Sequence, residues 1–263
     1  MTKQLFAILY TGYYVVCVIS LLFTEKGIEN MHVLFINGSP HPRGCTWRAM
    51  VEVSKELHAA GITIEWVHVG VQAVRGCMGC MKCREGGINK CIYGDDTVNI
   101  ALNRMAVCDA LVVGSPVHYG GACGAVTSFL DRMFFAGANA GIFEGKPGAA
   151  VVSCRRAGST AALEQLNKYF TINNMPLIPS YYWNMVHGNT IEEVEQDKEG
   201  MFVMRQVGRN LVWILKALKA GKEQGIVFPA AQPDEIVRTN FIRKTSPDYS
   251  FHMPQPETDK YLP

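Results

Sequence analysis

Residues 32–48 read HVLFINGSPHPRGCTWR, and this stretch decides the fold. Its first five residues form a short apolar run with the length and β-branched content expected of a buried strand. Glycines and prolines then turn the chain at residues 38–44, and residues 46–60 have the apolar spacing of a helix. Such a strand–loop–helix unit builds an anion site, because the first helical N–H groups have no intrahelical acceptor and the helix dipole adds positive charge.

Side chains of the same loop add to this anion site. Ser39 and Thr46 supply hydroxyl donors, and Arg43 supplies a charged donor. The loop is not a Walker phosphate loop, because no Gly-Lys-Ser/Thr closes it, and the chain contains no strict G-x-G-x-x-G dinucleotide fingerprint. The pattern therefore predicts a site for another kind of phosphate monoester, with an ordinary strand-to-helix turn as the alternative.

The composition is that of a globular protein with a sizeable core. Of the 263 residues 48% are hydrophobic and 18% charged, which suits one large domain or two small ones. A net charge of +2, without a basic patch interleaved with aromatics, gives no reason to expect nucleic acid as a partner. Four of the nine cysteines lie in residues 77–91 and the others show no pairing pattern, so we expect a reducing, cytoplasmic location.

The first thirty residues carry an apolar run. Residues 5–23 contain no charge and are just long enough to cross a bilayer. Three interpretations compete: a signal peptide, which would lack a small-x-small cleavage site; a membrane anchor, whose flanking charge bias would be weak; or sequence upstream of a natural start at Met31. We expect the third, because Met31 directly precedes the first strand. The chain then divides into a leader at 1–30, one domain at 31–224 and a Pro-rich, irregular tail at 225–263.

Downstream of the leader, strand patterns alternate with helix patterns. We predict strands at residues 32–36, 63–69, 110–114, 148–153 and 177–182, and helices at 46–60, 96–107, 125–135, 159–171 and 190–220, the last as one long helix or two. Pro176 and Pro179 assign the fifth strand to an edge of the sheet. The alternation predicts an α/β fold in which helices cover both faces of a parallel sheet.

Three unusual loops follow predicted strands, at residues 38–46, 115–124 and 153–158. In parallel α/β sheets, ligands bind outside the carboxyl ends of the strands, near the point where the strand order reverses. Because all three loops lie at that edge, we expect them to meet there and to form one binding site.

Five motifs are specific as a set. They are NGSPHPRGCT at 37–46, GSPVHYG at 114–120, FLDR at 129–132, GAAVVSCRR at 148–156 and YWNMVHG at 182–188. Together they resemble the flavodoxin-like, NAD(P)H-dependent FMN reductase family, over about residues 31–244. The resemblance implies a doubly wound, five-stranded parallel sheet in the order 2-1-3-4-5 and a bound FMN. It also implies hydride transfer from NAD(P)H to flavin N5, with no side chain needed as acid, base or nucleophile.

The resemblance assigns FMN to the three loops. The phosphate is expected on Ser39, Arg43, Gly44, Cys45 and Thr46. The isoalloxazine ring is expected against Pro116, Val117, His118, Tyr119 and Gly120, with Ser153, Arg155 and Arg156 near its N1–O2 side. Cys45 stands where relatives usually carry Asn, so one side-chain contact to the phosphate is lost while the backbone N–H remains. For the two arginines, a solvent-exposed surface is the alternative.

A second motif has the spacing C-x2-C-x2-C-x7-C and consists of Cys77, Cys80, Cys83 and Cys91. Four thiolates at this spacing suit an iron–sulfur cube or tetrahedral zinc. The motif resembles the compact cysteine motif of the iron–sulfur flavoproteins, a branch of the same fold that passes electrons between a [4Fe-4S] cluster and FMN. Zinc, free thiols and a redox disulfide stay open as alternatives.

These observations predict an FMN-dependent NAD(P)H oxidoreductase that passes electrons to a quinone, flavin, nitro compound or protein acceptor. Two alternatives stay open: an iron–sulfur flavoprotein that exchanges electrons with ferredoxin, and a flavodoxin-like electron carrier without a substrate of its own. The acceptor pocket is expected at Tyr181, Tyr182, Trp183 and His187, for which strand-end packing is the alternative. The family resemblance implies a homodimer or homotetramer.

Overall fold

The computed structural model describes residues 31–71, 73–87, 90–94 and 97–229. Its centre is a parallel sheet in the order β2-β1-β3-β5-β6. The strands are β1 (His32–Asn37), β2 (Thr63–His68), β3 (Ala110–His118), β5 (Gly148–Cys154) and β6 (Met185–His187). A short β4 (Gly121–Ala122) pairs with β3 in antiparallel fashion and lies off this path. Without β4 the order is 2-1-3-4-5, so the predicted flavodoxin-like α/β fold is confirmed.

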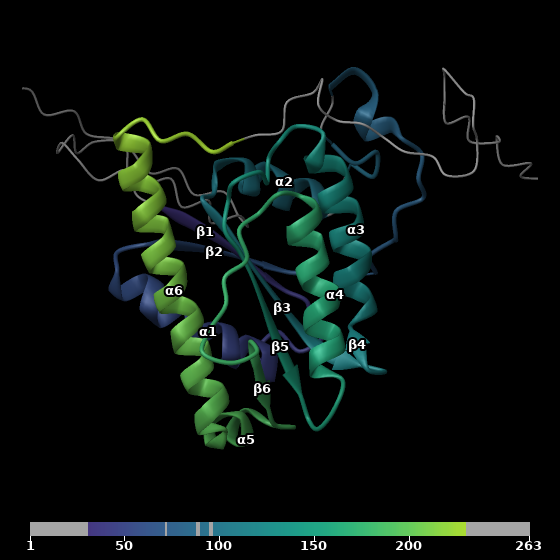
Figure 1. The fold of residues 1–263 in the computed structure, drawn as a ribbon. Coiled ribbons are helices and arrows are strands. Elements are labelled where there is room, and N and C mark those ends of the chain that lie inside the picture. The colour runs from purple at the N-terminus through teal and green to yellow at the C-terminus, as the bar shows by residue number, and fades with distance from the viewer. Residues whose placement is uncertain (1–30, 72, 88–89, 95–96, 230–263) are drawn as a thin grey trace, which may run out of the picture.

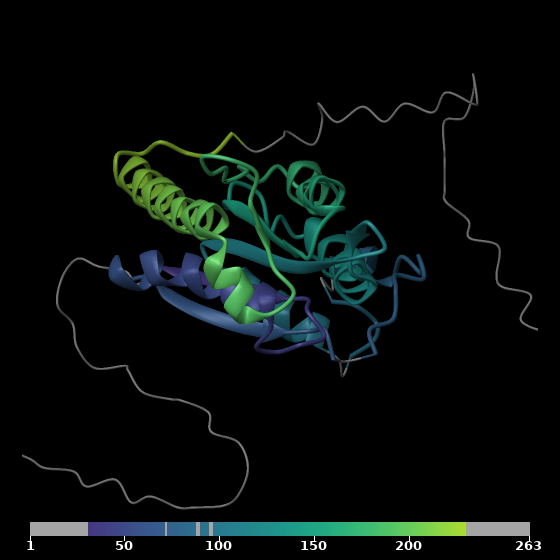
Figure 2. The same cartoon turned by 90° about the horizontal axis from the view of Figure 1, so that it is seen from below.

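Helices cover both faces of the sheet (Figures 1 and 2). On one face lie α1 (Cys45–Ala59), α5 (Ile191–Gln196) and α6 (Lys198–Glu223). On the other lie α2 (Thr97–Val107), α3 (Gly124–Ala138) and α4 (Ser159–Ile172). The cysteine segment contains one short 3₁₀ helix, η1 (Lys82–Gly87).

Strand β1 shows why its sequence is a continuous apolar run. Leu34 and Ile36 pack with α2, α3 and α4, whereas Val33 and Phe35 pack with α1 and α6, and all four are fully buried. A strand buried on both faces cannot alternate apolar with polar residues. The same two-sided burial holds for most of β3 and for β5. Because the three strands run parallel, their carboxyl ends lie at one edge of the sheet.

Two predicted element boundaries are wrong. The fifth strand is β6 rather than residues 177–182, where Leu177 forms only an isolated bridge to Gly148. Proline at 176 and 179 supplies no N–H for a ladder, so pairing with β5 resumes only at Met185. Strand β3 also runs on to His118, so the first part of the predicted loop 115–124 is strand.

The remaining predictions fall at the ends of the chain. The leader at 1–30 and residues 230–263 of the tail lie outside the described residues, and residues 225–229 form neither helix nor strand. The division into leader, domain and tail therefore stays a prediction. In the described ranges, no helix is both long and apolar enough to span a bilayer.

Candidate functional site

The three predicted loops meet at the carboxyl edge of the sheet, which we call the rim (residues 37–46, 114–124 and 153–158). Gly38 N donates to Gly114 O at 2.8 Å, which ties the first loop to the second. The Thr46 and Ser153 hydroxyl oxygens are 2.8 Å apart, which ties the first to the third. The second and third loops also touch, because a Cβ added at Gly158 would lie 2.7 Å from the backbone of Gly120.

The first loop is shaped by local side-chain bonds. Asn37 Oδ1 accepts from Ser39 N at 3.0 Å, and Asn37 Nδ2 donates to Pro42 O at 3.1 Å. Ser39 Oγ in turn accepts from His41 N at 3.1 Å. These bonds satisfy the turn internally, so the loop can expose its remaining N–H groups to a ligand.

The loop ends at an open helix N-terminus. Gly44 is the N-cap of α1 and has no side chain to cap it, so the N-terminus of this 15-residue helix is open. Ser39 and Thr46 are buried, at 3% and 1% exposure, whereas Arg43 is exposed. In the Thr46–Ser153 pair one hydroxyl donates to the other, which leaves one hydrogen for an anion. The arrangement offers backbone, hydroxyl and guanidinium donors to a phosphate.

Cys45 lies at this N-terminus and is half-buried. Burial raises the pKa of its thiol and outweighs a backbone hydrogen bond that lowers it, and the nearby charges of Glu193 and Glu192 at the start of α5 raise the pKa further. Cys45 therefore carries a neutral thiol, and its contribution to an anion site is its backbone N–H.

The second loop is a tight hairpin. Tyr119 and Gly120 connect β3 to β4 with positive φ values of 50° and 79°, as the two central residues of a type I′ turn require. A tyrosine is uncommon in this conformation, and its side chain is fully exposed. Ser115 stabilises the base of the hairpin. Its Oγ accepts a hydrogen bond from Cys123 N at 3.0 Å and donates one to Pro116 O at 2.8 Å. The hairpin therefore presents an exposed aromatic ring and Val117 beside the rim.

The third loop places its residues at two depths. Ser153 is buried under the rim, whereas Arg155 and Arg156 are exposed. Gly158 has a φ of 89° as the N-cap of α4, a conformation that a side chain would strain. Arg155 and Arg156 therefore lie on the solvent-exposed side of the rim. There they either supply positive charge to a bound anion or form an ordinary solvent-exposed surface.

All four cysteines of the second motif line one small cavity against α3, which we call the cysteine pocket. Cys83 is buried, Cys80 and Cys91 are half-buried and Cys77 is exposed. Burial raises the pKa of the Cys83 thiol, and negative charge on its three partner sulfurs would raise it further. The structure therefore brings together the four residues that the spacing selected.

The chain around the cysteine pocket is irregular and strained. Gly79 and Met81 both have positive φ values, of 67° and 59°, which is uncommon for a methionine. The buried Asn99 side chain accepts from Cys91 N at 2.8 Å and donates to the carbonyls of Cys91 and Tyr93 at 2.9 Å each. This clamp fixes the fourth cysteine against α2.

One arginine lines the cysteine pocket and a second lies next to it. Arg132 of α3 is 2% exposed and donates from Nε and Nη2 to Cys91 Sγ, each at 3.2 Å. Arg84 stacks on Phe135 at 4.2 Å, and its Nε is buried without a hydrogen-bond partner among the described residues. Charge of this sign suits an anionic group held by thiolates.

The thiols do not converge on one point. Within the described residues, no three His, Cys, Asp or Glu side chains are placed to hold a single metal ion. Tetrahedral zinc requires its four ligands within about 2.3 Å of one centre, whereas in a [4Fe-4S] cluster the four thiolates bind four different irons. The four cysteines supply a donor set that suits either group, and a [4Fe-4S] cluster does not require the four sulfurs to meet at one metal ion.

The predicted acceptor residues lie next to β6. Tyr181, Tyr182 and Trp183 are exposed by 81, 53 and 54% and precede this strand. His187 pairs with Cys154 across β5 and β6, which puts it at the rim. Their exposure leaves these side chains open to a small molecule or to another protein surface.

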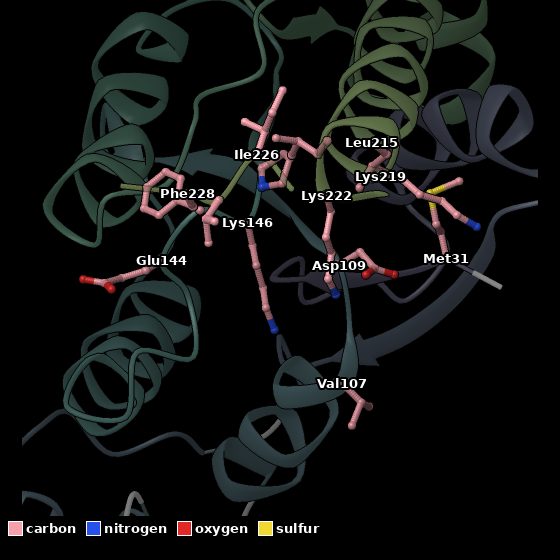
Figure 3. A pocket seen from close by; sticks show the side chains of 14 residues that line it. Met31, Val107, Asp109, Glu144, Lys146, Leu215, Lys219, Lys222, Ile226 and Phe228 are labelled. Atoms are coloured by element: carbon pink, nitrogen blue, oxygen red, sulfur yellow. The ribbon is translucent and has the colours of Figure 1, made fainter. Parts of the chain in front are cut away.

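A larger cavity, of about 600 Å³, lies at the opposite edge of the sheet, where the strands begin (Figure 3). Met31, Asp109 and Phe228 line it, together with Lys146. The Lys146 ammonium donates to Met105 O at 2.7 Å, so it caps the end of α2. This cavity is far from the three loops, and the rim and the cysteine pocket are the better candidate sites.

Arg132 and Asn99 are not among the site residues predicted from the sequence. The signal for Arg132 was one charge on the otherwise apolar, buried face of a predicted helix, where a charge requires a partner. Asn99 carried no comparable signal, because an Asn in a helix is most often solvent-exposed.

Known proteins resemble this chain along most of the described domain. The model of the NADPH-dependent FMN reductase family matches residues 31–190. An iron-sulfur flavoprotein of Methanocaldococcus jannaschii is 27% identical over 195 residues, which are 72% of this chain and 100% of that protein. An iron-sulfur flavoprotein of Archaeoglobus fulgidus is 32% identical over 102 residues, 39% of this chain and 48% of that protein.

Solved structures share the fold at low sequence identity. RosB, determined with bound 8-demethyl-8-formylriboflavin-5'-phosphate, superposes with a TM-score of 0.57 at 12% identity, over 86% of this chain and 97% of that one. The NAD(P)H:quinone oxidoreductase of Methanothermobacter marburgensis gives a TM-score of 0.51 at 14% identity, over 69% and 96%.

Proposed function

The chain belongs to the NADPH-dependent FMN reductase family and is a flavin-dependent oxidoreductase, and on this premise we propose that it works as an iron–sulfur flavoprotein. In this proposal FMN binds at the rim, NAD(P)H or a reduced protein supplies electrons, and the cysteine pocket holds a [4Fe-4S] cluster. The observation that carries the proposal is the cysteine pocket itself, in which four thiols and a buried arginine meet. Relatives named iron-sulfur flavoprotein support it.

The proposed phosphate site is the first loop and the start of α1. Bound FMN supplies hydride and electron chemistry at its ring, and the protein's task is to hold and orient it. The uncapped N–H groups after Gly44, the buried hydroxyls of Ser39 and Thr46, and the Arg43 guanidinium offer donors to a phosphate dianion. Cys45 adds its backbone N–H.

The proposed ring site is the hairpin. Pro116, Val117 and Tyr119 would form an apolar wall, while the backbone at His118 and Gly120 allows close approach of the ring edge. The tyrosine's strained, exposed conformation supports this role, because backbone strain concentrates at ligand sites. Ser153, Arg155 and Arg156 would supply donors and positive charge on the N1–O2 side.

The two proposed sites are connected by helix α3. Helix α3 begins at Gly124, directly after the hairpin, and Arg132 lies eight residues further along it, which is about 12 Å at the helical rise. Gly76, which precedes Cys77, lies near Ser128, one turn of α3 closer to the hairpin than Arg132. Electrons could therefore pass between rim and cysteine pocket along one helix.

We propose a one-electron protein carrier of the ferredoxin type as the partner, because a [4Fe-4S] cluster exchanges single electrons. The exposed Tyr181, Tyr182 and Trp183 offer a surface beside the rim for this partner, for a small acceptor or for a second subunit. A homodimer or homotetramer and a cytoplasmic location stay part of the proposal.

A second candidate omits the cluster: FMN takes hydride from NAD(P)H and passes electrons to a quinone, flavin or nitro compound. The match to the model of the NADPH-dependent FMN reductase family supports this candidate, because that chemistry needs no cluster.

Protein purified without oxygen separates the two candidates. The proposal predicts one FMN per chain with about four iron and four sulfide, broad absorbance beyond the flavin bands, and rapid reduction by ferredoxin. FMN without iron, with fast NADPH oxidation in the presence of a quinone, would establish the second candidate. Protein that contains FMN but no iron and that turns over neither donor would be assigned as a flavodoxin-like electron carrier.

A further inference from the structure

Arg132 is the most unusual charged residue of the described core. It is among the largest fully buried side chains, and it donates two hydrogen bonds to Cys91 Sγ while lying 4.8 Å over the Tyr93 ring. Burying a guanidinium is costly unless an anionic or strongly accepting group faces it. A thiolate, free or bound to a metal, accepts hydrogen bonds more strongly than a neutral thiol, so these two bonds place Arg132 where it can act on the charge of the Cys91 sulfur.

We propose that Arg132 is a positioning residue that raises the reduction potential of the cluster in the cysteine pocket. This inference rests on the proposed function. Reduction adds one electron, supplied by the flavin or by a protein donor that is itself oxidised, and no covalent bond forms or breaks. Part of the added charge resides on the ligand sulfurs. Hydrogen bonds and positive charge at Cys91 therefore stabilise the reduced form more than the oxidised form.

The pocket is built to hold this contact in place. The Asn99 clamp fixes the backbone of Cys91 on one side, and α3 fixes Arg132 on the other. The backbone of Cys91 and the side chain of Arg132 are therefore each tied to a helix, α2 and α3 respectively. Fixed donors act on a potential without reorganisation at each electron transfer.

Arg75 offers a matched control. Its guanidinium lies 5.5 Å from the centroid of the same Tyr93 ring, but its side chain is exposed, and among the described residues it donates to no cysteine sulfur. Removing Arg75 deletes one positive charge next to the pocket and leaves the sulfur contact intact. Removing Arg132 deletes the same charge together with both hydrogen bonds.

The test compares wild type, R132M, R132K and R75M, each purified without oxygen. Iron, sulfide and flavin are measured first, and the cluster is then titrated against potential with electron paramagnetic resonance as the readout. We expect R132M to hold about tenfold less reduced cluster at a fixed potential, which is 59 mV for a one-electron couple. R132K, which keeps the charge and one donor, should fall between R132M and wild type, and R75M should stay close to wild type.

Each outcome of this test either supports or contradicts the role of Arg132. Wild-type protein without iron and sulfide would overturn the proposed function and this inference with it. A wild-type cluster whose potential is unchanged in both R132M and R132K would contradict the inference alone. If R132M fails to fold or assemble, R132K decides the question. Loss of the cluster from both variants with retained flavin would assign Arg132 to assembly and would also contradict the inference.

Discussion

The rim and the cysteine pocket are built in opposite ways. At the rim, three loops are placed by parallel strands of fixed register, and the contacts between them are largely backbone or small hydroxyls such as the Thr46–Ser153 pair. At the cysteine pocket, an irregular segment with positive φ at Met81 is held by two polar side chains, Asn99 and Arg132. Regular backbone positions one site and side chains position the other.

This difference determines how each site should respond to change. A ligand held by several helix N–H groups and strand ends loses only part of its affinity when one hydroxyl is removed. A group held by four thiolates is lost when one ligand is lost, because the coordination is closed. Substitutions at one site should therefore leave the other intact.

The largest expected effect is at the cysteine pocket. Cys83→Ser removes the buried thiol of the four proposed ligands, and we expect nearly all iron to be lost while the flavin content stays at the wild-type level. Iron and flavin assays on the same sample measure both. Cys108→Ala, which alters a buried thiol outside the pocket, is the control and should keep its iron. Parallel loss of FMN in C83S would show that the two sites are not independent.

The next largest effect is at the rim. Thr46→Val keeps the shape of the side chain but removes the hydroxyl that bonds Ser153, and we expect the Kd for FMN to rise roughly 30-fold, or about 2 kcal/mol. Fluorescence titration of the flavin-free protein measures the Kd. Thr171→Val, on an exposed position of α4, should leave the Kd unchanged. Equal FMN affinity in T46V and wild type would contradict the assignment of the FMN phosphate to this loop.

A third prediction tests the contact that Glu52 makes between α1 and α6. Glu52 of α1 is buried; that burial alone would raise its pKa, but hydrogen bonds from Lys55, Arg205 and Arg48 outweigh it and lower the pKa to about 2, from 4.5. Because the folded pKa is depressed, this stabilisation is fully present above pH 4.5 and is lost as the pH falls toward 2.

We therefore expect Glu52→Gln to lower the free energy of unfolding by about 2 kcal/mol at pH 7, with salt reducing the effect because Lys55 and Arg205 are partly exposed. Between pH 4.5 and 2 the variant should lose less stability than wild type. Urea unfolding across this range measures both. Identical pH profiles of the two proteins would show that Glu52 does not anchor α1 to α6.

The smallest effect separates stability from function at the hairpin. Asn-Gly is the preferred pair for a type I′ turn, so Tyr119→Asn should relieve strain and stabilise the fold by about 0.5–1 kcal/mol. Thermal unfolding should show a rise in Tm of a few degrees. The same variant should bind FMN more weakly, because the ring wall is lost. A stabilised variant with unchanged FMN affinity would leave the tyrosine without a role in binding.

The sequence predicts the regular part of this molecule better than the irregular part. The buried run at 32–36 and the helix after Gly44 follow directly from hydrophobic period and turn residues, and so does the meeting of the three loops. The extension of β3 to His118 and the position of β6 could not be read in this way. They depend on pairing with strands that are distant in sequence, which no local pattern records.

The cysteine pocket shows the same division. Spacing alone grouped the four cysteines, which the structure brings to one pocket. The partners Asn99 and Arg132 were not identified, because their roles arise from α2 and α3 packing against the cysteine segment. A side chain's partner across such a contact depends on the tertiary arrangement and on the rotamer, and neither is encoded in residue spacing.

The most direct test of the central claim is the visible spectrum, with flavin and iron content, of the full chain purified without oxygen. The rim predicts a yellow protein that retains about one FMN per chain and, after FMN is stripped, takes it up again at micromolar concentration. A colourless protein that takes up no FMN at that concentration would contradict the assignment of the rim, whatever metal the cysteines hold.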